Sequence, residues 1–370
     1  MIYKAIGLMS GSSLDGLDIA YAHFQETGGK WSFEIKYADC FSYPDDWINQ
    51  LSQATALPAV DYHLLHTSYG HYTGELVNRF IDKHDLHHKV DLVSSHGHTT
   101  FHIPSRKMTA QLGDGAAIAA VTGLPVISDL RAMDIALGGQ GAPIVPIGEK
   151  LLLPEFDLLL NLGGIANISA KSGGDYVAFD ICSANRILNM LSGQQGVPFD
   201  EDGLMAASGK ANEALLYELG RLEYYKLPYP KSLANAFGVE MVYPLIINYG
   251  LETPDALRTY VEHIVDQIRL AIVNLMPKAE GHQSPAEGQR LLVTGGGAKN
   301  KFVISRLQQV LEEPGIKVVV PEDNLINFKE AVIMGLMGVL RWREENNTLA
   351  SVTGAKRNSI GGAIWMGAEA

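Results

Sequence analysis

The side chains best suited to chemistry are carboxylates that stand beside glycine turns. Asp15 lies in the segment of residues 10–18, together with glycines and three serine hydroxyls. Glycine turns leave backbone N–H groups free to face an anion, and hydroxyls can donate to phosphate oxygens. A carboxylate fits such a loop if a cation such as Mg²⁺ bridges it to the phosphates, so Asp15 is a candidate metal ligand. The alternative is an ordinary hairpin turn at Asp15-Gly16.

A second candidate, Asp180, follows the apolar residues 177–179 and precedes Asn185. A carboxylate at the end of a strand could project into a cleft between two lobes and act as a general base. A strand-terminal aspartate is also common as a helix cap, so the residues alone leave both interpretations open.

A third glycine turn, residues 294–298, follows the apolar run 291–293 and precedes a helical pattern from Phe302 to Val310. A helix that begins here would offer unpaired N–H groups and partial positive charge to a nucleotide phosphate or ribose. The sequence contains no G-x-x-x-x-G-K-[ST] motif, and no G-x-G-x-x-G follows a strand in a βαβ setting. We therefore expect nucleotide binding by another architecture.

Two further groups could contact a polar ligand. Arg131 follows the apolar residues 125–128 and could clamp phosphate or sugar oxygens, or form a surface ion pair. His96, His98 and His102 lie within seven residues, but no cysteine or carboxylate is spaced for tetrahedral coordination. We favour hydrogen bonding to a polyhydroxylated ligand over a zinc site.

The elements that must position these groups form a pattern that occurs twice. Strand-like runs separated by glycine turns predict an antiparallel meander in the first half, and the same pattern restarts near Phe156. Each meander is followed by a helical pattern and a further strand. The predicted meander strands cover residues 2–8, 17–24, 31–37, 157–161, 165–170 and 176–180, the helices 62–83, 185–191 and 212–222, and the further strands 92–95 and 291–294.

This repetition predicts two α/β lobes built alike, with a cleft between them. The first lobe is expected over residues 1–130, rejoined by 348–370, and the second over 131–347.

Composition excludes several classes of protein. Apolar residues make up 46% of the 370 residues and charged residues 19%, which is a globular balance and not a disordered one. The net charge is −12 and no stripe of Lys or Arg is present, so nucleic acid is not an expected partner. The longest apolar stretches, residues 151–162 and 331–340, are interrupted or too short to cross a bilayer. With no leader-like segment and no C-x-x-C pairing of Cys40 and Cys182, we expect a soluble cytoplasmic protein without disulfides.

Taken in order, the motifs resemble those of the anhydro-N-acetylmuramic acid kinases, within the sugar kinase, Hsp70 and actin superfamily. The resemblance extends over nearly the whole chain. It rests on residues 7–18, 95–99, 129–131, 136–143, 161–168, 179–180, 198–200 with Gly203, 295–300, 329–331 and 351–355.

The resemblance implies a two-lobed, actin-like (ribonuclease H-like) fold that uses ATP and Mg²⁺. It implies that Asp180 is the catalytic base and that Asp15 and Glu330 approach the metal. The substrate would meet Ser10, His96, Arg131, Asn185 and Glu330. ATP would be bound by Gly11, Ser12, Ser13, Leu14, Asp15, Gly16, Leu17, Asp18, Gly163, Gly164, Gly295, Gly296 and Gly297.

Members of this family bind a 1,6-anhydro sugar between the lobes, add water at the anomeric carbon and phosphorylate the released 6-oxygen. The expected substrate is 1,6-anhydro-N-acetylmuramic acid from recycled cell wall, and the expected product is its 6-phosphate. A homodimer is left open. The alternatives are a kinase of another anhydro sugar, such as levoglucosan, and a nonenzymatic ATP-binding switch of the actin or Hsp70 type.

Three short segments depart from the family pattern. The residues after Asp180 and Ile181 read Cys182-Ser183-Ala184-Asn185 where a Gly-Pro-Gly-Asn type of turn is usual. The first loop has Gly-Ser-Ser in place of Gly-Thr-Ser, which keeps the hydroxyl. His98 stands where glutamine is usual, which changes hydrogen-bonding valence and pH response.

Overall fold

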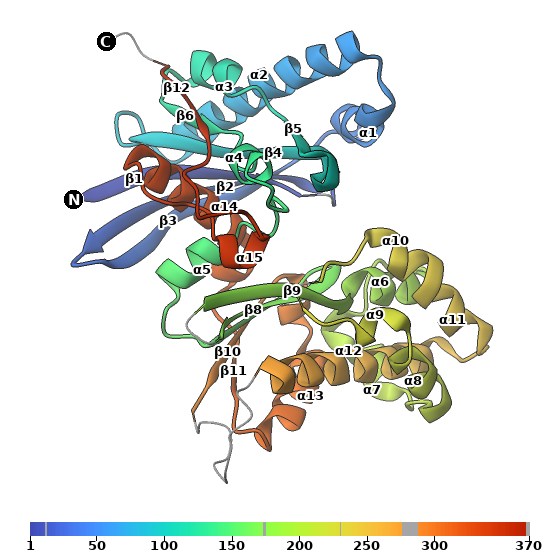
Figure 1. Cartoon of the computed structure of the whole chain (residues 1–370). Helices are drawn as coiled ribbons and strands as arrows, with labels where there is room; N and C mark the ends of the chain where they lie inside the picture. The colour runs from blue at the N-terminus through green and yellow to red at the C-terminus, as the bar shows by residue number, and fades with distance from the viewer. Residues whose placement is uncertain (12, 173–174, 230, 276–287, 368–370) are drawn as a thin grey trace. The chain divides into compact units, whose positions relative to one another are not determined.

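The computed structural model describes residues 1–11, 13–172, 175–229, 231–275 and 288–367. The chain divides into two units (Figure 1). Unit 1 is Met1–Pro154 with Phe328–Ala370, and unit 2 is Glu155–Asn327.

Unit 1 is built on a mixed sheet of seven strands. β1 (Ile2–Ser10), β2 (Gly16–Thr27) and β3 (Lys30–Ser42) form the antiparallel meander, because short turns join them. On its other side β1 pairs parallel with β4 (Leu92–Ile103), which pairs parallel with β6 (Val126–Ser128). β12 (Ala363–Trp365) and β5 (Met108–Leu112) add antiparallel to β6 and β4.

Helices pack on this sheet through apolar and small side chains. The long helix α2 (Ala59–Lys83) buries residues such as Leu76, Val77 and Phe80 against Ile6 and Leu8 of β1. Helix α14 (Asp323–Trp342) lies close against β1, since a Cβ on Gly7 would stand 1.8 Å from the carbonyl oxygen of Ala331. The remaining helices of unit 1 are α1 (Asp45–Gln53), α3 (Gly115–Thr122), α4 (Ala132–Ala136), α5 (Pro146–Leu152) and α15 (Ala350–Thr353).

Unit 2 repeats the same strand order and directions in a sheet of five strands. β7 (Leu158–Leu162), β8 (Ile165–Ser172) and β9 (Asp175–Ser183) are antiparallel, and β10 (Arg290–Thr294) and β11 (Lys317–Val319) continue parallel to β7. Two sheets of one topology confirm the predicted α/β class with two units built alike.

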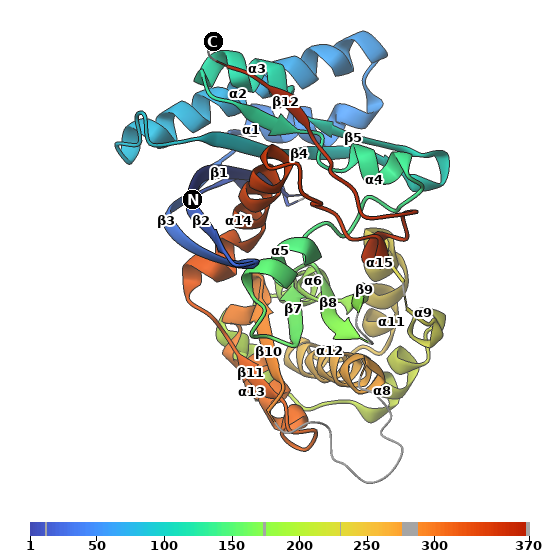
Figure 2. The same ribbon diagram turned by 60° about the vertical axis from the view of Figure 1, so that its left-hand side comes forward.

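The core of unit 2 is centred on α12 (Thr253–Leu275), which packs on β9 and on α13 (Figure 2). Its residues Tyr260, Ile264, Ile268 and Ile272 recur at helical spacing and are fully buried. The other helices of unit 2 are α6 (Asn185–Gly193), α7 (Leu204–Ser208), α8 (Glu213–Gly220), α9 (Glu223–Lys226), α10 (Asn235–Phe237), a π-helix (Gly238–Val242), α11 (Tyr243–Asn248) and α13 (Lys301–Glu312).

The division of the chain differs from the expected boundaries at residues 130 and 347. Residues 131–154 and 328–347 belong to unit 1. The reason is packing: α4 lies on β5, α5 lies on β3, and α14 lies on β1. Residues 348–370 also belong to unit 1, with β12 paired to β6.

Two expected strand ends are wrong. β4 does not end at Ser95, and β9 does not end at Asp180, because each strand continues through a β-bulge. Both cysteines are free thiols. Across the described ranges, no helix combines the length and the apolar character that crossing a membrane requires.

Candidate active site

The first glycine loop joins β1 to β2 in unit 1. Ser13 Oγ donates to Asp15 Oδ1 at 2.7 Å, and Leu14 has a φ of 58°. A Cβ on Gly11 would meet nothing nearer than Ser13 Oγ at 3.4 Å, so the backbone is accessible there. Ser12, also predicted to bind ATP, lies outside the described residues.

The second half of the predicted loop belongs to β2. A Cβ on Gly16 would stand 2.6 Å from the carbonyl oxygen of Phe41 and 2.8 Å from the sulfur of Cys40, so this glycine lets β3 approach. The side chain of Leu17 is 2% exposed and lies in the core. Strand packing therefore explains Gly16 and Leu17.

Acidic side chains from two elements come close together in unit 1. Burial raises the pKa of Asp18 to about 6; the Cys40 thiol opposes the shift by hydrogen bonding, and the charges of Asp15 and Glu330 add to it. Burial also raises the pKa of Glu330, and the charges of Lys329 and Arg131 oppose that shift.

These carboxylates have the oxygen chemistry that Mg²⁺ prefers. In the part of the chain that the structure describes, no three His, Cys, Asp or Glu side chains converge to enclose a metal. Mg²⁺ at phosphate-transfer sites is held by one or two carboxylates with phosphates and water, so Asp15 and Glu330 fit that mode.

His96 and Arg131 form a buried polar pair. His96 is 3% exposed, and burial followed by the charge of Arg131 lowers its pKa to about 3. Its Nε2 accepts from Arg131 Nε at 2.8 Å, and its Nδ1 lies 2.8 Å from the carbonyl oxygen of Gly97. His96 is therefore a neutral imidazole that carries its proton on Nδ1. The bulge of β4 at Gly97, whose φ is 72°, aims the imidazole at Arg131.

The loop after α4 supports this guanidinium. Arg131 also donates to the carbonyl oxygen of Gly141 at 2.5 Å. The backbone of Gly141 is held in turn by Asp134, which is fully buried and also accepts from Thr353 at 2.7 Å. The positioning role of Asp134 and Thr353 was not predicted, because they are far apart in the sequence.

The hydroxyl of Ser10 is hydrogen-bonded to the side chains of Tyr43 and His98. Ser10 is 3% exposed and accepts from the hydroxyl of Tyr43 at 2.8 Å. Because Tyr43 supplies that proton, the hydroxyl of Ser10 is free to donate to Nδ1 of His98, 3.1 Å away. The hydroxyl oxygens of Tyr43 and Tyr69 are 2.5 Å apart. Sequence reasoning missed both tyrosines, which lack a local pattern that points to Ser10.

In unit 2, Asp180 lies within β9 and not at its end. The pairing of β8 with β9 shifts register there, which leaves Ile181 as the extra residue of a bulge. The backbone N–H of Leu233 donates to Asp180 Oδ2 at 2.8 Å, and the hydroxyl of Tyr224 donates to the backbone oxygen of Asp180 at 2.7 Å. Burial raises the pKa of Asp180, and the hydrogen bond from Leu233 partly opposes this.

Within the described residues, Oδ1 of Asp180 receives no hydrogen bond, so this oxygen can accept a proton. The bulge sets the direction of the side chain and the Leu233 amide fixes its rotation. These are the properties of a positioned general base.

A cavity of about 430 Å³ opens beside the third glycine turn of unit 2. Gly295 has a φ of 80°, and a Cβ on Gly297 would meet Leu162 at 2.7 Å. A Cβ on Gly296 would meet nothing nearer than 3.8 Å. The walls of the cavity are Asn185, Leu188, Asn189, Phe199, Asp200, Glu201, Asp202, Val261, Gly296, Gly297, Lys299 and Asn300.

One expectation for this region needs correction. The turn does not open the following helix: residues 296–299 form a 3₁₀ turn, and α13 begins at Lys301 with Asn300 as its cap. Asn185 lines this cavity, and its side chain donates to the carbonyl oxygen of Leu162 at 2.8 Å. Its expected contact with the substrate stays a prediction.

The remaining predicted glycines, Gly163 and Gly164, form the turn between β7 and β8. Their carbonyl oxygens accept from the backbone N–H groups of Asn185 and Ala184. A Cβ on either glycine would meet nothing nearer than 3.5 Å. The carbonyl groups of the turn are therefore held by the backbone at the start of α6, whereas its Cα atoms face open space.

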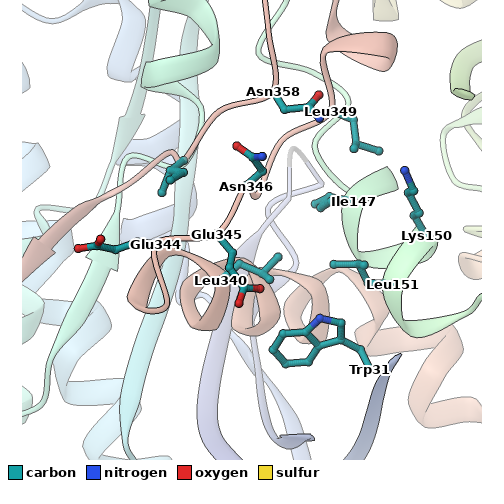
Figure 3. A pocket seen from close by; sticks show the side chains of 11 residues that line it. Trp31, Ile147, Lys150, Leu151, Leu340, Glu344, Glu345, Asn346, Leu349 and Asn358 are labelled. Atoms are coloured by element: carbon teal, nitrogen blue, oxygen red, sulfur yellow. The ribbon is translucent and has the colours of Figure 1, made fainter. Parts of the chain in front are cut away.

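Another cavity, of about 410 Å³, lies in unit 1 between α5 and the segment after α14 (Figure 3). Trp31, Lys150 and Glu345 are among its lining side chains, and none of the predicted site residues is.

The model of the family described as "Anhydro-N-acetylmuramic acid kinase" matches residues 3–367. The chain belongs to the anhydro-N-acetylmuramic acid kinase family. This confirms the resemblance inferred from the motifs and makes the protein a phosphotransferase.

Curated members of this family match over almost their whole length. The anhydro-N-acetylmuramic acid kinases of Hydrogenovibrio crunogenus, Vibrio cholerae and Haemophilus influenzae are each 32% identical, with 97% of both chains covered. Among solved structures, an activator of 2-hydroxyisocaproyl-CoA dehydratase from Clostridium difficile with bound ADPNP is 13% identical. The match covers 92% of this chain and 96% of that one, with a TM-score of 0.42.

The departure from the family pattern after Asp180 is accommodated by packing. Cys182, Ser183 and Ala184 are buried, so they do not widen the site. A Cβ on Gly238 would stand 2.5 Å from Ser183 Oγ. The glycine at the start of the π-helix thus provides the space that the serine side chain takes up.

Proposed function

We propose that this anhydro-N-acetylmuramic acid kinase family member uses ATP to open 1,6-anhydro-N-acetylmuramic acid hydrolytically and to phosphorylate its 6-oxygen. The product is N-acetylmuramic acid 6-phosphate, and the reaction belongs to the recycling of peptidoglycan in the cytoplasm. The observation that carries the proposal is Asp180, a carboxylate with one oxygen fixed by the Leu233 amide and the other open to accept a proton. The names of the relatives support this choice of substrate.

Asp180 would take a proton from water as the water oxygen attacks the anomeric carbon. The bond from that carbon to the bridging oxygen breaks on the opposite side, as in an inverting glycosidase. The freed 6-oxygen then attacks the γ-phosphorus of ATP, and ADP leaves. Burial of Asp180 raises its affinity for the proton and so strengthens it as a base.

The glycine turns are proposed to hold ATP. The cavity of about 430 Å³ in unit 2 is within the size range of small-molecule sites, and Gly296 leaves its backbone open to a nucleoside. The loop at Gly11 and Ser13 would face the phosphates with N–H and hydroxyl donors. Asp15 and Glu330 would hold Mg²⁺, which when bound neutralises charge on the phosphates.

The sugar is proposed to meet Ser10, His96 and Arg131. Burial lowers the pKa of Arg131 to about 10, so the guanidinium stays charged at neutral pH and suits a lactyl carboxylate. Levoglucosan lacks this carboxylate. The contact with Arg131 would therefore make the protein prefer the muramic acid sugar.

Replacing Asp180 with Asn tests the proposal. The assay is ADP release with ATP, Mg²⁺ and a panel of anhydro and ordinary sugars, with mass spectrometry of the product formed in ¹⁸O water. The native chain should add one water and one phosphoryl group to anhydro-N-acetylmuramic acid. Asp180→Asn should keep its affinity for ADP and lose turnover about 10²–10⁴-fold. Native turnover in the variant would contradict the assigned base, and an inactive native chain would favour the nonenzymatic switch.

A further inference from the structure

A buried ion pair in unit 1 has no part in the chemistry proposed above. Lys329 Nζ lies 2.5 Å from Glu149 Oε1, and each side chain is 5% exposed. Removing two charges from water carries a large desolvation cost, and replacing such pairs by apolar residues is often neutral or stabilising. Stability alone is therefore a weak reason for this chain to carry the pair.

The pair joins the two places where the chain passes between units. Glu149 is in α5, which ends two residues before Pro154, the last residue of the first segment of unit 1. Lys329 follows Phe328, the residue at which α14 enters unit 1. A second close contact binds the same helices, since a Cβ on Gly148 would stand 2.5 Å from Ile333 Cγ2.

The next residue along α14 is Glu330, the proposed ligand of Mg²⁺. The charges of Lys329, Glu149 and Arg131 shift the pKa of its carboxylate. The charge of Glu330 in turn raises the pKa of Asp18. The orientation of Glu330 is set by the helical turn that carries it, and this turn lies next to the point where α14 passes from unit 2 into unit 1. The ion pair of Lys329 with Glu149 lies one residue from Glu330, and α14 packs closely on α5 at Gly148. Together these contacts fix the turn.

We propose that Lys329 and Glu149 are positioning residues: their ion pair fixes the first turn of α14 within unit 1, and so aims the Glu330 carboxylate for Mg²⁺. This inference rests on the proposed function in that it takes Glu330 as a metal ligand. Groups that orient metal ligands typically affect affinity by about 10–100-fold when replaced.

The experiment compares Lys329→Met, Glu149→Leu and the double variant. Each single variant leaves one buried charge without its partner and should lower the Tm. The double variant should recover most of the Tm. It should nevertheless bind Mg²⁺ about tenfold more weakly, measured by calorimetric titration of the protein saturated with ADP. Amide hydrogen exchange of residues 328–333 in the metal-free protein should be faster than in the native chain.

A destabilised control comes from the same unit. Ile118→Ala removes a fully buried side chain from α3 and should lower the Tm without changing Mg²⁺ affinity or exchange in residues 328–333. If the double variant keeps native Mg²⁺ affinity and native exchange, the pair is only structural and the inference is overturned.

Glu330→Gln separates the two proposals. If that variant keeps native Mg²⁺ affinity, the metal role of Glu330 fails, and the hydrogen exchange of the double variant alone then decides whether the pair positions the turn.

Discussion

A single methyl group added at Gly7 should separate α14 from β1. In Gly7→Ala the new Cβ would stand 1.8 Å from the carbonyl oxygen of Ala331 and 2.5 Å from the amide nitrogen of Gly335. Ordinary contacts of this kind are about 3.4 Å or longer, so the helix must move away from the strand by about 1.5 Å. Both obstacles are backbone atoms of a helix and cannot rotate aside.

We expect Gly7→Ala to destabilise unit 1 by about 3 kcal/mol, the upper end of the range for overpacked cores. For a unit of about 200 residues this lowers the Tm by roughly 6–12 °C. The displacement also moves Glu330, the neighbour of Ala331, and a shift of about 1 Å can cost about 10²-fold in turnover. Differential scanning calorimetry and ADP release measure the two effects.

Gly193→Ala is the matched control, because a Cβ at this helical glycine meets nothing within 4 Å. It should raise stability slightly through helix propensity and leave turnover unchanged. A Gly7→Ala protein whose Tm is within about 2 °C of the native value would refute the packing of α14 on β1.

Two further predictions concern buried polar groups. Burial lowers the pKa of His263 from its usual value of 6.5 to about 3. At a pH below 6.5 the unfolded chain therefore binds a proton that the folded chain does not, and the free energy of unfolding should decrease as the pH is lowered. His263→Gln should flatten that fall by up to about 1.4 kcal/mol per pH unit in urea unfolding between pH 6.5 and 4, and an unchanged slope would contradict the shift. Tyr43→Phe removes the donor to Ser10 and the partner of Tyr69, which should cost about 1–3 kcal/mol in the same assay. The exposed Tyr37→Phe should change stability by less than about 0.5 kcal/mol, and an equal effect of both variants would rule out the Tyr43 hydrogen bonds as the cause.

Much of the fold could be predicted because its signals are local. Apolar runs separated by glycine turns mark β1, β2, β7 and β8, and helical spacing marks α2. The repeated meander then predicts a second unit. The unit boundary could not be predicted, since α14 continues through Asn327 and Phe328 without a turn or a change of composition.

The geometry of the site was less predictable because it depends on partners that are distant in the chain. Asp180 could be named from its motif, but the Leu233 amide that orients it lies 53 residues further on. Asp134 and Thr353, which together support the loop beside Arg131, are 219 residues apart. The bulges at Gly97 and Ile181 depend on the register of neighbouring strands, which the sequence of one strand does not specify.

The interleaving of the two units along the chain constrains the order of events during synthesis. Unit 2 is one continuous stretch, whereas unit 1 needs segments from both ends of the chain. β1 and β2 leave the ribosome before unit 2 does. The face of β1 at Gly7 stays uncovered until Ala331 and Gly335 of α14 have been made. Domains usually fold as their segments emerge, so unit 2 can complete its core while unit 1 still has an uncovered apolar face. The nascent chain is therefore most exposed to aggregation through β1 and β2 until α14 has been made.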